Sequence, residues 1–352
     1  MRIKELDFLR GVAILLVLFR HSDTRGILFH VGWMGVDLFF VLSGFLVSGL
    51  IFNEYKKTGT VNLKRFLIRR GFKIYPSFYL FILISILVEF LVYHRFYKPE
   101  IILAEVFYLQ NYFWGMWGHT WSIAVEEHFY LLLSIFAYFT IKYKTLGKQK
   151  VMLTYFLIVF VLTFLLRLKL SWQHQDDTLF GILQTHLRLD GILTGTVIAY
   201  IYYFTNYCKV LWAKKSLLLL LSALLLAPAF IFDGGAFLMN AFGITFINLG
   251  FGLLVLVGVE GQRMASLPLF APINMLVKAF CFIGVNSYSI YLWHLMSKKI
   301  IDYFEMSPYW SLLFYVMLSV ILGVILAYLV EKPFLKIRDY FFEAKVKPSI
   351  TA

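Results

Sequence analysis

Long apolar runs constrain this chain more than any other feature of its sequence. A helix needs about 20 apolar residues to cross the hydrocarbon core of a bilayer. Ten such segments occur in the 352 residues, roughly 7–27, 31–52, 73–94, 120–141, 151–170, 186–205, 216–233, 241–260, 275–296 and 309–330. Hydrophobic residues make up 61% of the chain and charged residues 15%, a composition too apolar for a soluble protein. The sequence predicts an all-α integral membrane protein with about ten transmembrane helices.

These helices are expected to form one membrane domain, residues 1–334, followed by a short basic cytoplasmic tail, residues 335–352. No small-residue cleavage site follows the first apolar run, so we expect that run to remain as a helix. The two cysteines, Cys208 and Cys281, provide neither a disulfide framework nor a metal-binding set. We therefore expect no bound metal.

Basic residues are distributed unevenly between the segments that join the predicted helices. With the N-terminus inside, 22 of the 33 Lys and Arg residues fall on the inner side and 7 on the outer side. Cytoplasmic loops of membrane proteins are enriched in Lys and Arg. The bias predicts that both termini are cytoplasmic, and it explains the net charge of +13 without nucleic-acid binding.

Arg10 and His21 are ionisable residues within the first predicted span. Because they are 11 residues apart, they share one face of a helix and lie about 16 Å apart along its axis. Arg10 then falls near the cytoplasmic interface and His21 beyond the midplane. A neutral imidazole accepts a proton from a hydroxyl, so His21 is a candidate general base. The alternative is that His21 satisfies a hydrogen bond in the core while Arg10 reaches the interface.

Residues 35–46 carry Asp37 and Ser43 at the start of the second span. An ionisable residue within a span is a functional candidate. Gly and Ser in the same run permit close contact between helices. The run is read equally well as a functional segment and as a packing face with Asp37 at the interface.

A basic cluster at residues 64–76 precedes the third span and contains Arg69, Arg70 and Lys73. Several cations at one place can bind phosphate groups. The alternative is a topology signal that also contacts lipid headgroups.

Residues 119–130 place several polar side chains at the start of the fourth span. Spacings of three and four residues put one set on a single helical face: His119, Ser122, Glu126 and Tyr130. Glu127 lies beside Glu126, and two adjacent carboxylates in a span are difficult to explain by packing alone.

Arg188 and Asp190 lie near the outer end of the sixth span, either as a functional pair or as a buried structural one. Ser287, Tyr291 and His294 share a helical face late in the chain, where we expect a core polar network. The phosphate-binding loop and the zinc-protease motif are absent from the sequence.

Several of these motifs, taken in order, resemble the acyltransferase-3 family of membrane O-acyltransferases that modify bacterial surface polysaccharides. The resemblance extends over nearly the whole chain and is carried by Arg10 and His21, by the runs at 35–46, 65–76, 119–131, 188–195 and 287–294, and by the closing run at 331–334. One departure is His128, at a position where the family more often has Gln.

The resemblance implies about ten spans and transfer of an acyl group, commonly acetyl, from cytoplasmic acyl-CoA to a sugar hydroxyl of a lipid-linked or exported glycan. The family's catalytic His matches His21, and its paired Arg matches Arg10. Its cytoplasmic Arg motif matches Arg69 and Arg70. We expect acyl-CoA to be a diffusible donor and no cofactor to be tightly bound.

The predicted mechanism places the CoA phosphates among the cations Arg10, Arg69, Arg70 and Lys73. His21 acts as general base on the acceptor hydroxyl, with a covalent acyl-histidine as the second alternative. Glu126, Glu127 and Asp37 are the candidates for orienting its ring. Trp121 and Ser122 are candidates for stabilising the oxyanion.

Two other classes of protein remain open at this stage. A transporter also carries buried carboxylates and histidines, although discontinuous helices in corresponding halves are not evident. A non-catalytic glycan exporter subunit is the other alternative. In each case we expect a multi-pass protein of the bacterial inner membrane, surrounded by lipid.

Overall fold

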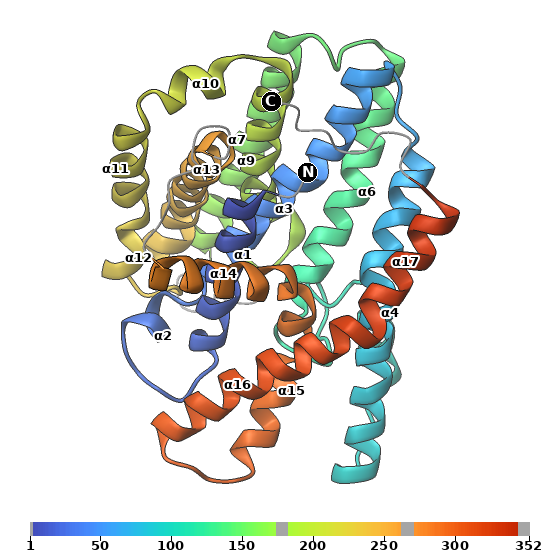
Figure 1. Cartoon of the computed structure of the whole chain (residues 1–352), viewed down its shortest axis with the longest axis vertical. Coiled ribbons are helices and arrows are strands. Elements are labelled where there is room, and N and C mark those ends of the chain that lie inside the picture. Colours follow the sequence, from blue (N-terminus) through green and yellow to red (C-terminus); the bar gives the residue numbers. More distant parts are fainter. Residues whose placement is uncertain (1–2, 174–181, 262–270, 344–352) are drawn as a thin grey trace.

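Helices form every regular element in the part of the chain that the structure describes, residues 3–173, 182–261 and 271–343 of a computed structural model (Figure 1). In chain order the elements are α1 (Lys4–Arg20), α2 (Ile27–Val31), α3 (Met34–Thr58), α4 (Leu63–Tyr93), α5 (Pro99–Val106), α6 (Trp121–Lys142), α7 (Gln149–Gln173), α9 (Thr185–Phe204), α10 (Tyr207–Trp212), α11 (Lys215–Leu226), α12 (Pro228–Ile231), the π-helix η1 (Met239–Gly243), α13 (Ile244–Gly261), α14 (Ala271–Val285), α15 (Ser287–Asp302), α16 (Pro308–Leu326), the π-helix η2 (Ala327–Glu331) and α17 (Lys332–Phe341). The all-α prediction is confirmed over these residues. Arg263, which we assigned to an inner loop, and residues 344–352 of the tail lie outside them.

Each predicted span coincides with a helix or a pair of helices, but the structure supports fewer crossings than ten. Six of the described helices are long and apolar enough to cross a membrane, or seven if the bent pair α14–α15 counts as one span. Large apolar side chains are exposed along α4, α7 and α16, as expected of surfaces that face lipid. The total of ten spans stays a prediction.

The ninth predicted span, 275–296, is broken rather than continuous. The axes of α14 and α15 meet at 80°, and the break falls at Asn286. The Asn286 side chain donates to the Phe282 carbonyl at 2.8 Å, which satisfies an acceptor that the interrupted helix leaves free. In Figure 1 α14 lies across the molecule while α15 turns away from it. The bend directs the polar face of α15 into the interior.

Two glycines allow α3 and α9 to pack closely. A Cβ on Gly44 would lie 1.9 Å from the Ile192 carbonyl oxygen, and one on Gly195 would lie 1.9 Å from the Val41 oxygen. Both positions therefore require a residue without a side chain. This confirms the packing role predicted for the run at 35–46 and fixes Asp37 against α9.

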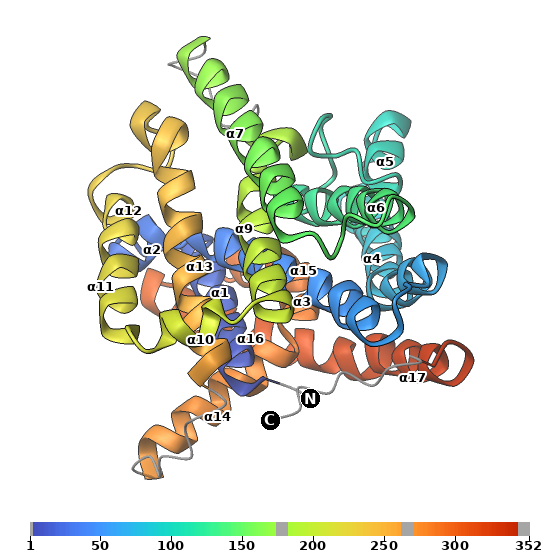
Figure 2. The same ribbon diagram turned by 90° about the horizontal axis from the view of Figure 1, so that it is seen from above.

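Segments that the charge count places on the same side of the membrane contact one another in the structure. Lys56 donates to the Tyr203 carbonyl, and α17 packs against α4, where both meet at the right of Figure 1. On the other side, Asp23 contacts Lys298 and Ser311. Seen from above, α7 and α14 extend from the other helices in opposite directions (Figure 2). Which of the two sides faces the cytoplasm stays a prediction.

Candidate active site

Three histidines from distant parts of the sequence meet in the interior. His21 follows the last residue of α1, His119 precedes α6, and His294 lies on α15. The ring of His294 is 4.9 Å from that of His21 and 4.8 Å from that of His119, measured between centroids. His119 and His294 are buried, and His21 is partly exposed. The predicted helical face of residues 119–130 is wrong at its first member, because α6 begins only at Trp121.

Each of these rings has one nitrogen within hydrogen-bonding distance of a backbone carbonyl. Nδ1 of His21 lies 2.9 Å from the Val17 oxygen, Nε2 of His119 lies 3.1 Å from the Leu292 oxygen, and Nδ1 of His294 lies 2.5 Å from the Tyr291 oxygen. A carbonyl only accepts, so each of these nitrogens carries the proton. The opposite nitrogens of His119 and His294 are buried without a partner. All three rings therefore present a free lone pair, and that of His21 is on Nε2.

His21 opens onto a cavity of about 310 Å³, here called the His21 cavity. Three polar or aromatic groups of its wall come from different elements: Trp33 before α3, Trp121 at the start of α6, and Arg188 on α9. Arg20 and Asn240 add further polar groups. His21 is therefore placed where a polar ligand could reach it.

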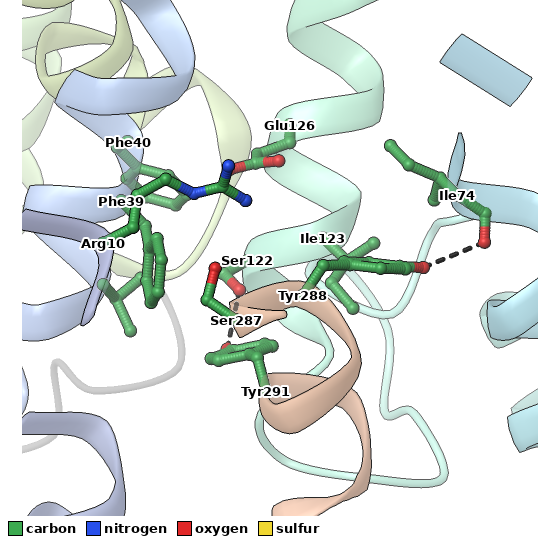
Figure 3. A pocket seen from close by; sticks show the side chains of 11 residues that line it. Arg10, Phe39, Phe40, Ile74, Ser122, Ile123, Glu126, Ser287, Tyr288 and Tyr291 are labelled. Atoms are coloured by element: carbon green, nitrogen blue, oxygen red, sulfur yellow. Dashed lines mark hydrogen bonds between the residues drawn. The ribbon is translucent and has the colours of Figure 1, made fainter. Parts of the chain in front are cut away.

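A second cavity of about 80 Å³, the Arg10 cavity, lies between α1, α3, α4, α6 and α15. In Figure 3 the Arg10 guanidinium points toward the Glu126 carboxylate. Ser122 donates to the Tyr291 hydroxyl at 2.7 Å, and Tyr291 in turn donates to the His119 carbonyl at 2.6 Å. Ser122 and Tyr291 are thus bonded to each other, whereas the Ser287 hydroxyl in the same wall is buried without a partner among the described residues.

A thin layer of side chains separates the two cavities; it contains Val36, Trp121 and Ser122 and is here called the partition. Val36 lines both of them. Trp121 lines the His21 cavity, and its neighbour Ser122 lines the Arg10 cavity. The Tyr291 ring, which also lines the Arg10 cavity, is 5.5 Å from the ring of His294. Arg10 and His21, predicted to share one helical face, therefore serve adjacent cavities.

Two buried ion pairs tie α3, α7 and α9 together beside the His21 cavity. Arg188 contacts Asp37 at 2.6 Å, and Arg167 contacts Asp190 at 2.8 Å. Arg188 and Asp190 are therefore not partners, which corrects the predicted pair. Arg167, counted on the outer side by the sequence, is fully buried on α7. On a helix, residues two apart point in different directions, so each finds a partner on another helix.

The candidate carboxylates have partners other than His21. Glu126 accepts from the Tyr130 hydroxyl at 2.8 Å, and Ser43 donates to the same hydroxyl at 2.8 Å. Glu127 is buried, with one oxygen unpartnered. Asp37 is bound by Arg188. The group that holds the His21 ring in this structure is the Val17 carbonyl.

The basic cluster lies on the first turns of α4, and two of its members are paired with acids from the end of the chain. Arg69 contacts Asp339 at 3.0 Å, and Lys73 pairs with Glu331. Arg70 lies 5.8 Å above the Tyr130 ring. The charge of Lys73 interacts with those of Arg10 and Arg70. The cations thus form one electropositive region between the Arg10 cavity and α17.

Asp23 lies in the loop between α1 and α2, two residues beyond His21. Lys298 donates to its carboxylate at 2.7 Å and Ser311 donates at 2.9 Å. These bonds, that of Lys298 first, lower the pKa of Asp23. Asp23 is therefore ionised at neutral pH and engaged by α15 and α16, rather than by His21.

His294 and Trp33 are the site residues that sequence reasoning missed. We expected His294 only in a core network, and Trp33 precedes the run at 35–46 that drew attention. The signal for His294 is its place in the run at 287–294, one of the ordered motifs. Across the described residues, no group of three or more His, Cys, Asp or Glu side chains has the geometry to hold a metal ion.

Comparison with known proteins assigns a family to this arrangement. A family model described as an acyltransferase domain matches residues 3–332. The peptidoglycan O-acetyltransferase OatA of Listeria monocytogenes is 25% identical over 83% of this chain and 49% of its own length. The O-acetyltransferase OatA of Staphylococcus aureus is 27% identical over 82% of this chain and 49% of its own. The chain thus spans about half the length of these relatives. No solved structure matches it.

Proposed function

The chain belongs to this acyltransferase family, and from that membership we propose that it is an acyl-CoA-dependent O-acetyltransferase acting on a sugar hydroxyl of a glycan. One observation carries the proposal. His21 has its Nδ1 proton fixed on the Val17 carbonyl and lines a cavity that is separated from a second cavity by only a thin partition. A base in the wall of one of two adjacent cavities suits a reaction that joins two substrates.

The donor enters from the electropositive region on α4. The CoA phosphates bind among Arg69, Arg70 and Lys73, because several cations offset phosphate charge. The acetyl thioester extends past Arg10 into the Arg10 cavity. This assigns the cluster and both termini to the cytoplasm of a bacterium and the protein to its inner membrane, in agreement with the Lys and Arg bias.

His21 acts as the general base in the transfer. Its Nε2 takes the proton from the acceptor hydroxyl while the oxygen attacks the thioester carbonyl. The carbon–sulfur bond then breaks, and the CoA thiolate takes the proton back from the imidazolium. Trp121, on the partition, is the candidate to donate to the oxyanion through its indole N–H, because Ser122 donates its one hydroxyl proton to Tyr291. Direct transfer is the first mechanism, and an acetyl-histidine on His21 is the alternative.

The acceptor is a surface or lipid-linked glycan. The name of the Listeria relative states peptidoglycan as its substrate, which supports a glycan acceptor here. Bound glycan enters the His21 cavity, whose wall contains indole rings and hydrogen-bond donors.

Thioester cleavage tests the proposal. The purified chain, reconstituted in lipid nanodiscs, should release CoA from acetyl-CoA when a glycan acceptor is present, and mass spectrometry should find one acetyl unit added to the glycan. A transporter or an exporter subunit would bind or move its substrate without releasing CoA. Absence of both products in the folded protein would refute the proposal.

A further inference from the structure

The His21 cavity contains buried hydrogen-bond donors that nothing in the described structure satisfies. The Trp33 indole nitrogen and the Arg188 Nε are both buried without a partner, and both residues line the cavity. Arg188 as a whole is 5% exposed. Buried polar groups are almost always hydrogen-bonded. Two unsatisfied donors in one cavity indicate a missing acceptor.

No other group in the described structure occupies these two N–H groups. The other end of Arg188 is occupied, because its NH2 group donates to Asp37 at 2.6 Å. A Cβ on Gly234 would lie 3.0 Å from the Trp33 indole nitrogen, so Gly234 places no side chain beside that nitrogen. Arg20, a third donor in the wall, makes only a long bond of 3.3 Å to the Phe29 carbonyl.

Apolar ring surface lies beside these donors. Trp33 and Trp121 both line the cavity, and the Arg188 guanidinium lies 5.3 Å above the Trp121 ring. Aromatic rings next to polar groups suit a ligand that has an apolar face and a polar edge, as a pyranose does. A lipid tail would leave the N–H groups unsatisfied.

We propose that the His21 cavity binds a sugar residue that carries a carbonyl-type acceptor, an acetamido group or a carboxylate, close to the hydroxyl that faces His21. A hydroxyl has a proton of its own to place, whereas a carbonyl or carboxylate oxygen offers only lone pairs. Donors on Trp33 and Arg188 therefore favour a carbonyl over a plain hydroxyl. The role of the hydroxyl rests on the proposed function, but the binding preference does not.

Binding without acetyl-CoA tests this preference. The full chain in nanodiscs is titrated calorimetrically with three probes of equal length: an oligomer of N-acetylglucosamine, an oligogalacturonate, and cello-oligosaccharide, which has only hydroxyls. We expect at least one of the first two to bind about tenfold or more tightly than the third, the size expected for a satisfied buried donor. The two carbonyl arms distinguish an acetamido group from a carboxylate.

Conservative variants connect the preference to the two donors. Trp33→Phe keeps an aromatic ring and removes the N–H, and Arg188→Lys keeps a cation against Asp37 and removes Nε. Each should reduce the preference about tenfold or more while cello-oligosaccharide binding stays unchanged. Trp172→Phe, at an exposed tryptophan outside the cavity, is the control and should change nothing.

The results separate this inference from the proposed function. Equal binding of all three probes by the wild type, or a preference that survives both variants, overturns the inference even if CoA is released. A clear preference that the variants abolish supports the inference even in a protein that releases no CoA, where only the proposed function would fail.

Discussion

The Arg10 cavity and the His21 cavity lie side by side, but their walls differ. In the Arg10 cavity of about 80 Å³, Ser122, Tyr288 and Tyr291 have hydrogen-bond partners, and the Ser287 hydroxyl has none in the described structure. In the His21 cavity of about 310 Å³, two donors have none. A small cavity in which most of these hydroxyls are satisfied suits an extended chain such as an acyl thioester. A larger cavity with unsatisfied donors suits a polar ligand that carries hydrogen-bond acceptors.

Under the proposed function, this difference makes the partition the place where the two substrates meet. His294 lies next to both His21, in the wall of one cavity, and Tyr291, in the wall of the other, and a backbone carbonyl holds each of the rings of His21, His119 and His294. No carboxylate is bonded to His21 among the described residues, and the Val17 carbonyl holds its ring in place. The following predictions test whether the two cavities have different tasks.

Substitution at His21 should have the largest effect. In His21→Gln the side chain keeps a hydrogen bond but cannot take a proton, so acetyl transfer should fall by roughly 10²–10⁴-fold, the usual contribution of a general base. Binding of acetyl-CoA should stay unchanged, because the donor lies across the partition. The measurements are CoA release and equilibrium binding of a non-hydrolysable acetyl-CoA analogue. A Gln variant with wild-type turnover would make His21 a structural residue.

Loss of the buried ion pair beside the His21 cavity should reduce the free energy of unfolding more than loss of an exposed ion pair on α17. Arg167→Met leaves the Asp190 carboxylate buried without its cation, which should reduce the free energy of unfolding by about 3–5 kcal/mol. Arg338→Met removes a cation from exposed Asp339 on α17 and should cost less than about 1 kcal/mol. SDS-induced unfolding of the reconstituted protein measures both. An equal reduction of the free energy of unfolding in both variants would mean that the ion pair of Arg167 and Asp190 does not stabilise the fold beside the His21 cavity.

Hydropathy predicted where helices form, but not how their polar residues pair. The run at 275–296 is apolar enough to predict one continuous span, but the amide of Asn286, a local contact, stabilises a bend within it. Arg188 and Asp190 are neighbours in sequence, yet their partners come from α3 and α7. Such pairings depend on how helices are arranged in space, which periodicity does not encode. His21 and Arg10 were identifiable because an ionisable residue in a span is exceptional.

His294 should contribute less than His21. Its ring lies next to that of His21, and its free lone pair can help to hold the proton that His21 acquires. His294→Gln should therefore lower kcat by about 10–100-fold, the size of a lost hydrogen bond to a charged group. KM for both substrates should change little, because His294 lines neither cavity. A parallel rise in both KM values with unchanged kcat would instead show that His294 only shapes the partition.

The smallest effects should come from the cations on α4, and they should differ between neighbours. Arg70→Ala removes a cation that stacks on Tyr130, so KM for acetyl-CoA should rise about tenfold or more with little change in kcat, as for a contact made equally in ground and transition states. Arg69→Ala should raise KM less, since Arg69 already shares its charge with Asp339. Asp339→Ala removes that competitor and should lower KM.

Replacement of Arg70 by Lys separates charge from geometry: a mild effect means that charge suffices, and a loss as large as that of Ala means that paired guanidinium bonds are required. Wild-type KM in both Ala variants would show that the cluster marks topology, and the donor would then have to bind elsewhere than at the Arg10 cavity.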